Sequence, residues 1–470
     1  MILSFRKRKI YQIQAFIVIF MFYACYNFFT KQGAMFMKIF ENIAVAAAPI
    51  LIPKETIDMK KWAVIACDQY TSEPEYWEAV EQGVKDSPST LNLIYPEAFL
   101  EEDETKKADR LLSIKKTASE YLNGDIWNET EDGFIVLDRA TSLHPSRKGL
   151  VISVDLEQYS YEKGNKERIR ATEGTVLSRI PPRVKIRANS PIELPHIMLL
   201  LDDPNGNVIE KAWDAMITSS NKAIYDTDLW GQSGHIKGYF VDSNSEVFDG
   251  IIAAFKTLCE ESKDGMLFAV GDGNHSLASA KAHWDSIKAS LNDEQRKSHP
   301  ARFALAEVVN IHDKGLEFEP IHRVVFGCDA ASLIEEAKKF YADCSVSFTS
   351  EKCNNCDSLS CQCFTIVGTN MSDTNCILTK PKHSLAVGSV QMLLDSLVEK
   401  SNGAISVDYI HGEDSVRRLA TAGNCGILLP NVSKNSFFGT IETEGVFPRK
   451  TFSMGEAFEK RFYIEAKRIV

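Results

Sequence analysis

The sequence predicts a mixed α/β (α+β) protein with a main α/β domain and an additional α/β lobe toward its carboxyl end. Two observations predict this class. Short apolar runs of strand length alternate with amphipathic helical patterns from Trp62 onward, and polar turns rich in Gly and Asn separate them. The chain has 470 residues, more than the ~100 to 200 of one typical domain, so we expect at least two lobes.

The expected elements follow in order from apolar runs and from helix start signals. A buried strand is expected at 62–67, and the residues at 72–75 match a capping box that opens a helix. Further strands are expected at 150–154, 197–201 and 266–270, and further helices at 277–291, 333–341 and 390–398.

Composition and charge narrow the class of function. Hydrophobic residues make up 44% of the chain and charged residues 25%, which is typical of a globular protein and excludes global disorder. The formal net charge of -11 opposes attraction to phosphate backbones, so we expect no nucleic-acid partner. The sequence contains no Walker lysine motif, HExxH helix or GxSxG elbow, which disfavours P-loop ATPases, zincins and serine hydrolases.

We divide the chain into a doubtful hydrophobic extension at 1–36, a main α/β domain at 37–330 and a carboxyl-terminal α/β lobe at 331–470. The extension has a basic run at 6–9 before an apolar stretch. Three interpretations stay open: sequence upstream of the true start, a membrane anchor through 11–30, or a cleaved signal peptide. A stable membrane partner is expected only if the extension is real.

The cysteines favour a reducing compartment. There are 11, an odd number, and most lie in apolar runs, which indicates reduced thiols in a cytoplasmic protein. Four share one polar segment: Cys353, Cys356, Cys361 and Cys363. Thiolates this close could chelate zinc, although structural zinc sites usually take ligand pairs from separate turns. A surface loop that binds no metal is the alternative, and the choice stays open.

The most informative stretch is a glycine turn between an expected strand and an expected helix. It consists of Gly271, Asp272, Gly273, Asn274, His275 and Ser276. The glycines allow a tight turn that leaves amide N–H groups and the positive helix end facing outward, which suits a phosphate. We expect Asp272 to hold a cation or accept a hydroxyl proton, and His275 to contact an anionic oxygen or move a proton near neutral pH. A purely structural turn capped by Asn274 is the alternative.

A second candidate is an arginine-rich segment that contains Arg168, Arg170, Arg179, Arg183 and Arg187. Guanidinium groups clamp anions bidentately, so we expect Arg170 and Arg183 to bind substrate or phosphate. Glu173 lies among these cations, which would keep its carboxylate charged and suit it to orient a hydroxyl nucleophile. The alternative is a solvated face whose arginines pair with Glu167, Glu173 and Glu193.

Histidines next to charged residues supply further candidates. We assign His196, His322 and Arg323 to the substrate or anion site, with a structural hydrogen-bonding role as the alternative for each histidine. A similar stretch at 408–414 contains His411. Near the carboxyl end, the basic residues at 447–450 are expected to add cationic contacts to the same pocket.

Several of these strings together resemble the family catalogued as domain of unknown function 1015. They are WAVIACDQYTSEPEYW at 62–77, IRATEGT at 169–175, RIPPR at 179–183, ELPH at 193–196, GDGNHS at 271–276, DYIHGE at 408–413 and PRK at 448–450. The resemblance covers the chain from about Met37 onward. It leaves 1–36 unmatched, which favours the interpretation of an upstream start.

The glycine turn is also similar to the phosphate-binding turn of the ParB and sulfiredoxin group, which includes archaeal kinases that phosphorylate free serine. This resemblance implies a ParB/sulfiredoxin-like nucleotide-binding core with ATP or ADP and Mg2+ as cofactors. It also implies that the nucleotide is bound by Gly271, Gly273, Asn274 and Ser276. Those kinases usually carry an arginine where this chain has Ser276, so one of the arginines assigned above is the expected substitute.

These features predict a nucleotide-dependent phosphotransferase that acts on a small hydroxyl metabolite, with free serine as a candidate. Glu173, Asp272 and His275 are the expected catalytic residues. Two other classes stay open: a nucleotide-gated clamp without metabolite turnover, and a non-catalytic scaffold. The expected partners are a nucleotide and a small molecule. The sequence leaves open which nucleotide, which acceptor and which oligomeric state.

Overall fold

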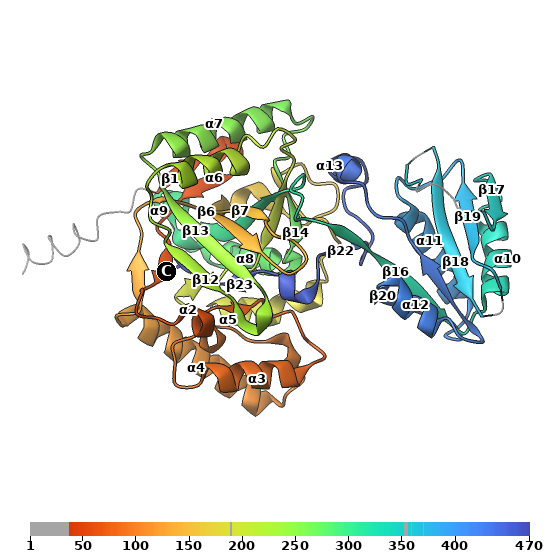
Figure 1. Ribbon diagram of the computed structural model, residues 1–470, viewed down its shortest axis with the longest axis horizontal. Coiled ribbons are helices and arrows are strands. Elements are labelled where there is room, and N and C mark those ends of the chain that lie inside the picture. Colours follow the sequence, from red (N-terminus) through yellow and green to blue (C-terminus); the bar gives the residue numbers. More distant parts are fainter. Residues whose placement is uncertain (1–36, 189, 352–355, 359, 370) are drawn as a thin grey trace, which may run out of the picture. The chain divides into compact units, whose positions relative to one another are not determined.

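The computed structural model describes residues 37–470 except 189, 352–355, 359 and 370. Its strands form two large sheets and three small ones, and helices cover the faces of the large sheets, so the expected mixed α/β class is confirmed (Figure 1). Contacts divide the chain into the units Met1–Lys38 and Ile39–Val470, and every described helix lies in the second unit.

The strands are β1 Lys38–Phe40, β2 Val45–Ala47, β3 Leu51–Pro53, β4 Val64–Ile65, β5 Trp127–Glu129, β6 Gly133–Ala140, β7 Lys148–Asp155, β8 Tyr159–Ser160, β9 Ile169–Arg170, β10 Ile192–Glu193, β11 Met198–Leu201, β12 Tyr225–Asp228, β13 His235–Asp242, β14 Phe268–Asp272, β15 Phe303–Asn310, β16 Phe318–Phe326, β17 Val346–Thr349, β18 Gln362–Gly368, β19 Thr374–Leu378, β20 Ser406–His411, β21 Asn424–Leu428, β22 Phe452–Met454, β23 Phe462–Tyr463 and β24 Lys467–Arg468. The described α-helices are α2 Met59–Trp62, α3 Pro74–Val84, α4 Glu104–Asn123, α5 Ile180–Ala188, α6 Ile209–Thr218, α7 Glu246–Glu261, α8 Asn274–Lys288, α9 Asp293–Ser298, α10 Ala330–Phe340, α11 Ala386–Lys400, α12 Glu413–Leu419 and α13 Lys434–Glu444.

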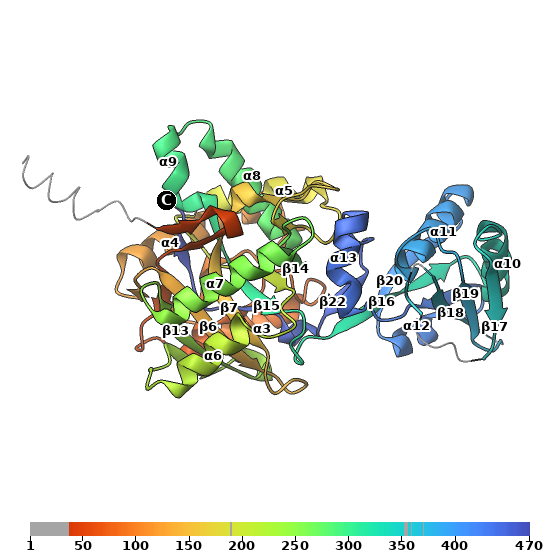
Figure 2. The same cartoon turned by 90° about the horizontal axis from the view of Figure 1, so that it is seen from above.

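The first large sheet has the order β12-β13-β6-β7-β15-β11-β14-β9-β8 and combines antiparallel with parallel pairs. Successive residues of its central strands face opposite sides, as the pleat requires. Val136 and Ile152 pack with α6, α7 and α8, whereas Ile135 and Val151 pack with residues of α2, α3 and the chain end. In both views α6 and α7 lie side by side over this sheet (Figures 1 and 2).

The second large sheet has the order β17-β19-β18-β21-β16-β20, and β22 pairs with the first half of β16. Side chains of α10 and α11 fill one face, and Val416 of α12 packs on the other. This sheet begins with β16, which lies before the domain boundary that we expected near 330. Furthermore, β23 pairs with β4 and β24 with β10, so the chain end returns to the amino-terminal part. Periodicity along the sequence does not reveal such long-range pairing.

Most expected elements are confirmed within a few residues. The strands β7, β11 and β14 and the helices α8, α10 and α11 lie where apolar patterns placed them. The strand expected at 62–67 is shorter, because α2 ends at Trp62. The capping box at 72–75 is wrong: α3 begins at Pro74, and the preceding residue makes no side-chain cap bond. Proline at the first helical position sets φ for the helix without such a cap.

Two sequence-based predictions fall on residues that the structure does not describe. The possible anchor at 11–30 lies outside the described residues, and so does Cys353 of the cysteine segment. Within the described residues, the N–H group of Cys363 donates to the carbonyl oxygen of Cys356 at 2.9 Å. No helix of the described chain is long and apolar enough to cross a bilayer.

Candidate functional site

The expected glycine turn is a sharp connection from β14 to α8. β14 ends at Asp272, Gly273 has φ 80°, and α8 begins at Asn274. A Cβ added at Gly273 would lie 3.1 Å from Ile197 Cα, and its φ strains any other residue. Among the described residues, the N–H groups of Asn274 and His275 have no acceptor. These amides and the positive end of α8 are therefore available to an anion.

Asn274 does not cap the helix, so the capping role expected for it in a structural turn is wrong. Its Oδ1 accepts from the N–H of Thr172 at 3.2 Å, and its Nδ2 donates to Thr172 Oγ1 at 3.2 Å. Thr172 in turn donates its hydroxyl to the carbonyl oxygen of Val270 at 2.6 Å. Asn274 thus fastens the start of α8 to the segment after β9, which carries Glu173.

Glu173 lies beside Asp272 and beside the basic residues of 447–450. Its Oε1 accepts from the N–H of Lys450 at 3.2 Å. Burial raises the pKa of Glu173, the charge of Asp272 raises it further, and Lys450 and Arg449 lower it only in part. The nearby cations therefore lower this pKa by less than burial raises it, contrary to the expectation that their effect would dominate. A carboxyl group with a raised pKa is instead suited to accept a proton.

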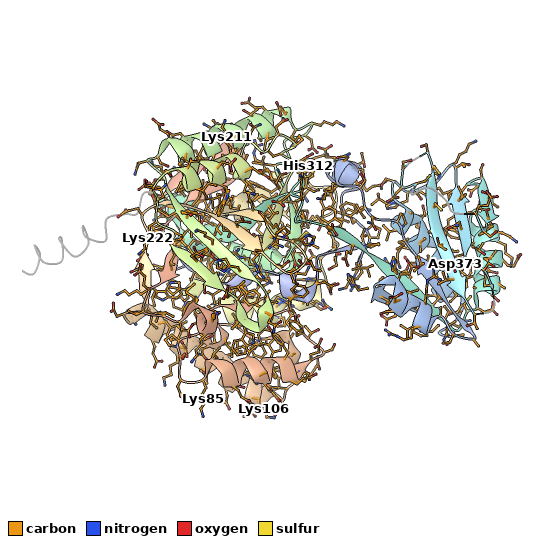
Figure 3. The ribbon with its side chains drawn as sticks, viewed as in Figure 1. Lys85, Lys106, Lys211, Lys222, His312 and Asp373 are labelled. Carbon is orange, nitrogen blue, oxygen red and sulfur yellow. The ribbon has the colours of Figure 1, made fainter. Side chains whose placement is uncertain are left out.

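Asp272 has a buried cation as its partner. Its Oδ1 accepts from the N–H of Gly273 at 2.9 Å, and its Oδ2 lies 3.2 Å from Lys460 Nζ. Lys85, Lys106 and Lys222 are exposed at the surface (Figure 3), whereas Lys460 is only 9% exposed. A lysine buried at this point neutralises carboxylates that would otherwise repel one another.

Asp68 joins the same cluster from the loop after β4. Burial by itself would raise its pKa, but the charge of His196, a hydrogen bond from Gln69 and the charge of Lys460 together lower it. Asp272 therefore has Glu173 as one acidic neighbour and shares Lys460 with Asp68. Carboxylates brought together in this way can hold a divalent cation or a hydroxyl group.

His196 connects the turn to the last strands through hydrogen bonds. Its Nε2 lies 2.8 Å from Ser276 Oγ, and its Nδ1 lies 2.7 Å from Tyr463 Oη. Tyr463 Oη also accepts from the N–H of Cys67 at 3.2 Å. The tautomer of His196 decides which of its two partners donates to the ring.

His275 lies in a positive environment. Burial lowers its pKa to about 4, and the charges of Arg183, Arg179 and Arg449 lower it in the same direction. Its Nε2 accepts from the N–H of Val176 at 3.3 Å, which requires a neutral ring. A group of this pKa does not exchange protons near neutral pH, so the structure does not support the expected proton shuttle. The three arginines nevertheless create a positive potential at the start of α8.

The structure brings only some of the expected arginines to this place. Arg183 forms an ion pair with Glu97 while its charge acts on His275. Arg170 is fully buried and donates from Nη1 to Asp264 Oδ2 at 2.8 Å, so it does not join the cluster. Arg170 lies opposite Ala269 of β14, and its partner Asp264 precedes that strand, whereas the glycine turn follows it.

His322 and Arg323 lie on β16 and contact the site only indirectly. His322 Nδ1 accepts from the N–H of Leu429 at 3.1 Å, a structural hydrogen bond. Arg323 Nη1 donates to the carbonyl oxygen of Lys450 at 3.0 Å, and Nη2 donates to that of Arg449 at 3.3 Å. Arg323 thus holds the segment that carries the basic residues. Its expected direct contact with an anion is not supported, because backbone carbonyls occupy its donors.

The sequence reasoning missed three residues of the cluster: Asp68, Lys460 and Tyr463. Asp68 had a signal, because it follows an apolar run and belongs to one of the family-like strings. Lys460 and Tyr463 had none, since no motif in their local sequence connects them with the glycine turn. Tyr463 is 267 positions away from His196.

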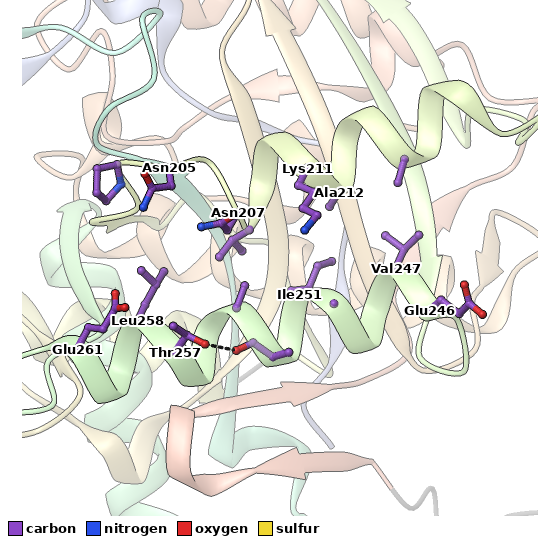
Figure 4. A pocket seen from close by; sticks show the side chains of 16 residues that line it. Asn205, Asn207, Lys211, Ala212, Glu246, Val247, Ile251, Thr257, Leu258 and Glu261 are labelled. Atoms are coloured by element: carbon purple, nitrogen blue, oxygen red, sulfur yellow. Dashed lines mark hydrogen bonds between the residues drawn. The ribbon is translucent and has the colours of Figure 1, made fainter.

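Two of the hollows in the described part of the second unit differ in what lines them. One, of about 940 Å³, adjoins the cluster, with His196, Ser276 and Tyr463 in its wall. The other, of about 530 Å³, is a groove between α6 and α7 (Figure 4), and Lys211, Ile251 and Leu258 line it without any residue of the cluster. Only the first is positioned to serve chemistry at the start of α8.

The histidine stretch at 408–414 contributes a separate group. His411 forms an ion pair with Glu319 on the neighbouring strand, and its Nδ1 lies 3.9 Å from Glu456 Oε1. One ligand atom from each of the three lies within 4.8 Å of the others. All three side chains are more than a third exposed, as in an ordinary cross-strand ion pair.

Together the fold and the cluster define a mixed α/β protein in which carboxylates flank the unbonded amides of a helix start. The chain belongs to the family described as "Protein of unknown function (DUF1015)", whose sequence model matches residues 51–397. This confirms the resemblance of the sequence motifs. No curated protein matches the chain.

Solved structures show a distant likeness. A conserved hypothetical protein from Pyrococcus furiosus is 10% identical, with 68% of this chain and 95% of that chain covered and a TM-score of 0.33. A mutant of free serine kinase in complex with AMP is 11% identical, with 67% and 90% covered and a TM-score of 0.35. C-terminally truncated SbnI from Staphylococcus aureus is 11% identical, with 65% and 82% covered and a TM-score of 0.32. A likeness at these TM-scores does not establish a common function.

Proposed function

We propose that the cluster binds the phosphates of a nucleotide and transfers a phosphoryl group to a small hydroxyl metabolite. One observation carries this proposal: unbonded amides at the start of α8 coincide with cationic side chains and with the carboxylates of Glu173 and Asp272. Phosphoryl transfer requires little more than positioned phosphates, neutralised charge and an oriented hydroxyl group.

Each group has a role that follows from its surroundings. The N–H groups of Asn274 and His275 would hold phosphate oxygens, together with Arg449 and the arginines of 179–183. Glu173, with its raised pKa, would accept the proton of the attacking hydroxyl. Serine is one candidate for the acceptor, and ATP or ADP for the nucleotide.

A magnesium ion fits the donor set. Asp272 and Asp68 offer the carboxylate oxygens that Mg2+ prefers, and Lys460 balances their charge in its place. When bound, Mg2+ would neutralise charge on the phosphates. These two carboxylates are the residues that would hold it.

The test combines binding with turnover. Binding to the wild-type protein is measured as the thermal shift caused by ATP or ADP with Mg2+, without a metabolite. Turnover is measured as nucleotide consumption after serine or a related hydroxy metabolite is added. Glu173→Gln should reduce kcat on the order of 10² to 10⁴-fold and leave the nucleotide-induced shift in place. Asp272→Asn should weaken both turnover and the Mg2+ dependence of binding.

The matched control is Asp285→Asn, because Asp285 lies on the same helix as the amides but pairs at the surface with Lys281 and Lys288. It should leave binding and turnover unchanged. Full turnover in both Glu173→Gln and Asp272→Asn, or the absence of a shift with either nucleotide, would refute the proposal. Nucleotide-dependent closure that needs no acceptor would indicate the clamp instead.

A further inference from the structure

The hollow beside Ser276 is large for the small acceptor considered so far. Its volume is about 940 Å³, near the upper end of the ~300 to 1,000 Å³ of pockets for drug-sized ligands. At ~30 Å³ for each water molecule, this is room for roughly 30 of them. A molecule of the size of serine would leave most of the space to water.

The walls of this hollow are mainly apolar. Buried side chains from several segments face it, among them Leu93, Ile94, Ile192, Ile197 and Leu305. Leu111 of α4 adds a partly buried side chain. Water gains few hydrogen bonds against such walls, so an apolar ligand that displaces it is favoured.

The partly buried arginines of the wall are paired with carboxylates of the wall, whereas Glu101, Glu104, Arg179 and Lys185 are exposed. Arg183 forms an ion pair with Glu97, and Arg187 Nη2 lies 2.5 Å from Glu193 Oε2. A nucleoside carries many donors and acceptors on its base and ribose, and burying them without partners is costly. The wall therefore suits a carbon chain or ring better than a nucleoside. The hydroxyl of Ser276 and the ring of His196 give it one polar end, at the start of α8.

We propose that this hollow binds the acceptor, and that the acceptor is a hydroxyl compound with an apolar body of several carbons rather than free serine. This inference rests on the proposed function. The hydroxyl group lies at the polar end formed by Ser276, and the apolar body extends toward α4 and α5. In the reaction, the hydroxyl oxygen bonds to the terminal phosphorus of the nucleotide, the bond from that phosphorus to the leaving nucleotide oxygen breaks, and the hydroxyl proton goes to Glu173.

The experiment uses the full chain and a graded series of probes, 1-butanol, 1-hexanol and 1-octanol, with Kd measured by isothermal titration calorimetry. Transfer of one methylene from water to an apolar site is worth ~0.8 kcal/mol, so Kd should tighten about four-fold for each added methylene. Serine should bind more weakly than 1-hexanol. In the presence of ATP and Mg2+, the alcohol that binds best should be phosphorylated.

Adjacent leucines of α4 provide a matched pair of variants. Leu111→Trp places an indole in the hollow and should abolish the increase in alcohol affinity with chain length. Leu112 is 65% exposed and lies outside the wall, so Leu112→Trp should keep the gain. Ile186→Trp, on α5 in the same wall, repeats the blocking test if Leu111→Trp does not fold.

The outcomes separate this inference from the proposed function. The inference is overturned if the affinity for the alcohols does not increase with chain length. It is also overturned if this increase persists in both Leu111→Trp and Ile186→Trp. Binding of adenosine that Leu111→Trp blocks also overturns it, because the hollow would then hold the nucleoside. Alcohol binding without a thermal shift from any nucleotide overturns the proposed function, and with it the role of acceptor, but leaves the apolar ligand site in place.

Discussion

Acid should destabilise this protein through a buried histidine of the second sheet. His322 is 7% exposed, and its Nδ1 accepts from the N–H of Leu429 at 3.1 Å. Burial lowers its pKa from 6.5 to about 4, and although Glu413 raises it, the positive charges of Arg323 and His411 add to the lowering. Protonation would remove the acceptor and place a charge next to the buried guanidinium of Arg323.

The direction and the size of the pH effect on the unfolding free energy follow from the linkage between proton binding and folding. The unfolded chain binds a proton at His322 near pH 6.5, whereas the folded chain binds it only near pH 4. The neutral form therefore contributes its full stability above pH 6.5, and this contribution is lost as the pH falls toward 4. The difference between the two values corresponds to about 3 kcal/mol, and about 2 kcal/mol should be lost at ~pH 5.

The assay is urea denaturation of the wild type and of His322→Asn at pH 7.5 and pH 5. The amide oxygen of asparagine can accept from Leu429 much as Nδ1 does, but the side chain does not titrate. The decrease in unfolding free energy between the two pH values should therefore be about 2 kcal/mol smaller in the variant.

His235 supplies a control of opposite sign. Hydrogen bonds and charges of Asp228 and Asp226 raise its pKa against the opposing effect of burial, so its contribution is present at low pH and is lost as the pH rises. Replacement by Asn should make the protein more sensitive to acid. An unchanged pH dependence in His322→Asn would refute the reasoning about burial at that position.

Three further predictions concern the cluster and its supports. Arg461→Met removes the partner of the buried Glu307 and should cost about 3 to 5 kcal/mol of unfolding free energy in urea; a loss below 1 kcal/mol would contradict this. Gly273→Ala should lower Tm more than Gly231→Ala, because both glycines have positive φ but only at Gly273 does an added Cβ approach another backbone. Pyrophosphate bound at the start of α8 should raise the pKa of His275 above about 4, seen in the imidazole NMR shifts, because it neutralises nearby arginines; an unchanged titration would place the anion elsewhere.

Local features of the chain were predictable from sequence. The strand before the glycine turn and the helix after it follow from apolar runs of the right length and period. The need for glycine at Gly273 follows from turn chemistry, which neighbouring residues alone determine. The family was also evident, because its motifs are short strings of consecutive residues. In each case the residues that allow the prediction belong to the predicted element or to the element next to it in the sequence.

The tertiary structure decided which charged residues meet. Arg170 and Arg183 stand close together in the sequence, yet one pairs with Asp264 far from the turn and the other acts on His275. Lys460 reaches Asp272 from a distant segment because β23 returns to pair with β4. Whether a side chain is buried, and which charge faces it, depends on strand pairing between segments far apart in sequence. The raised pKa of Glu173 and the hollow beside Ser276 therefore exist only in the folded chain.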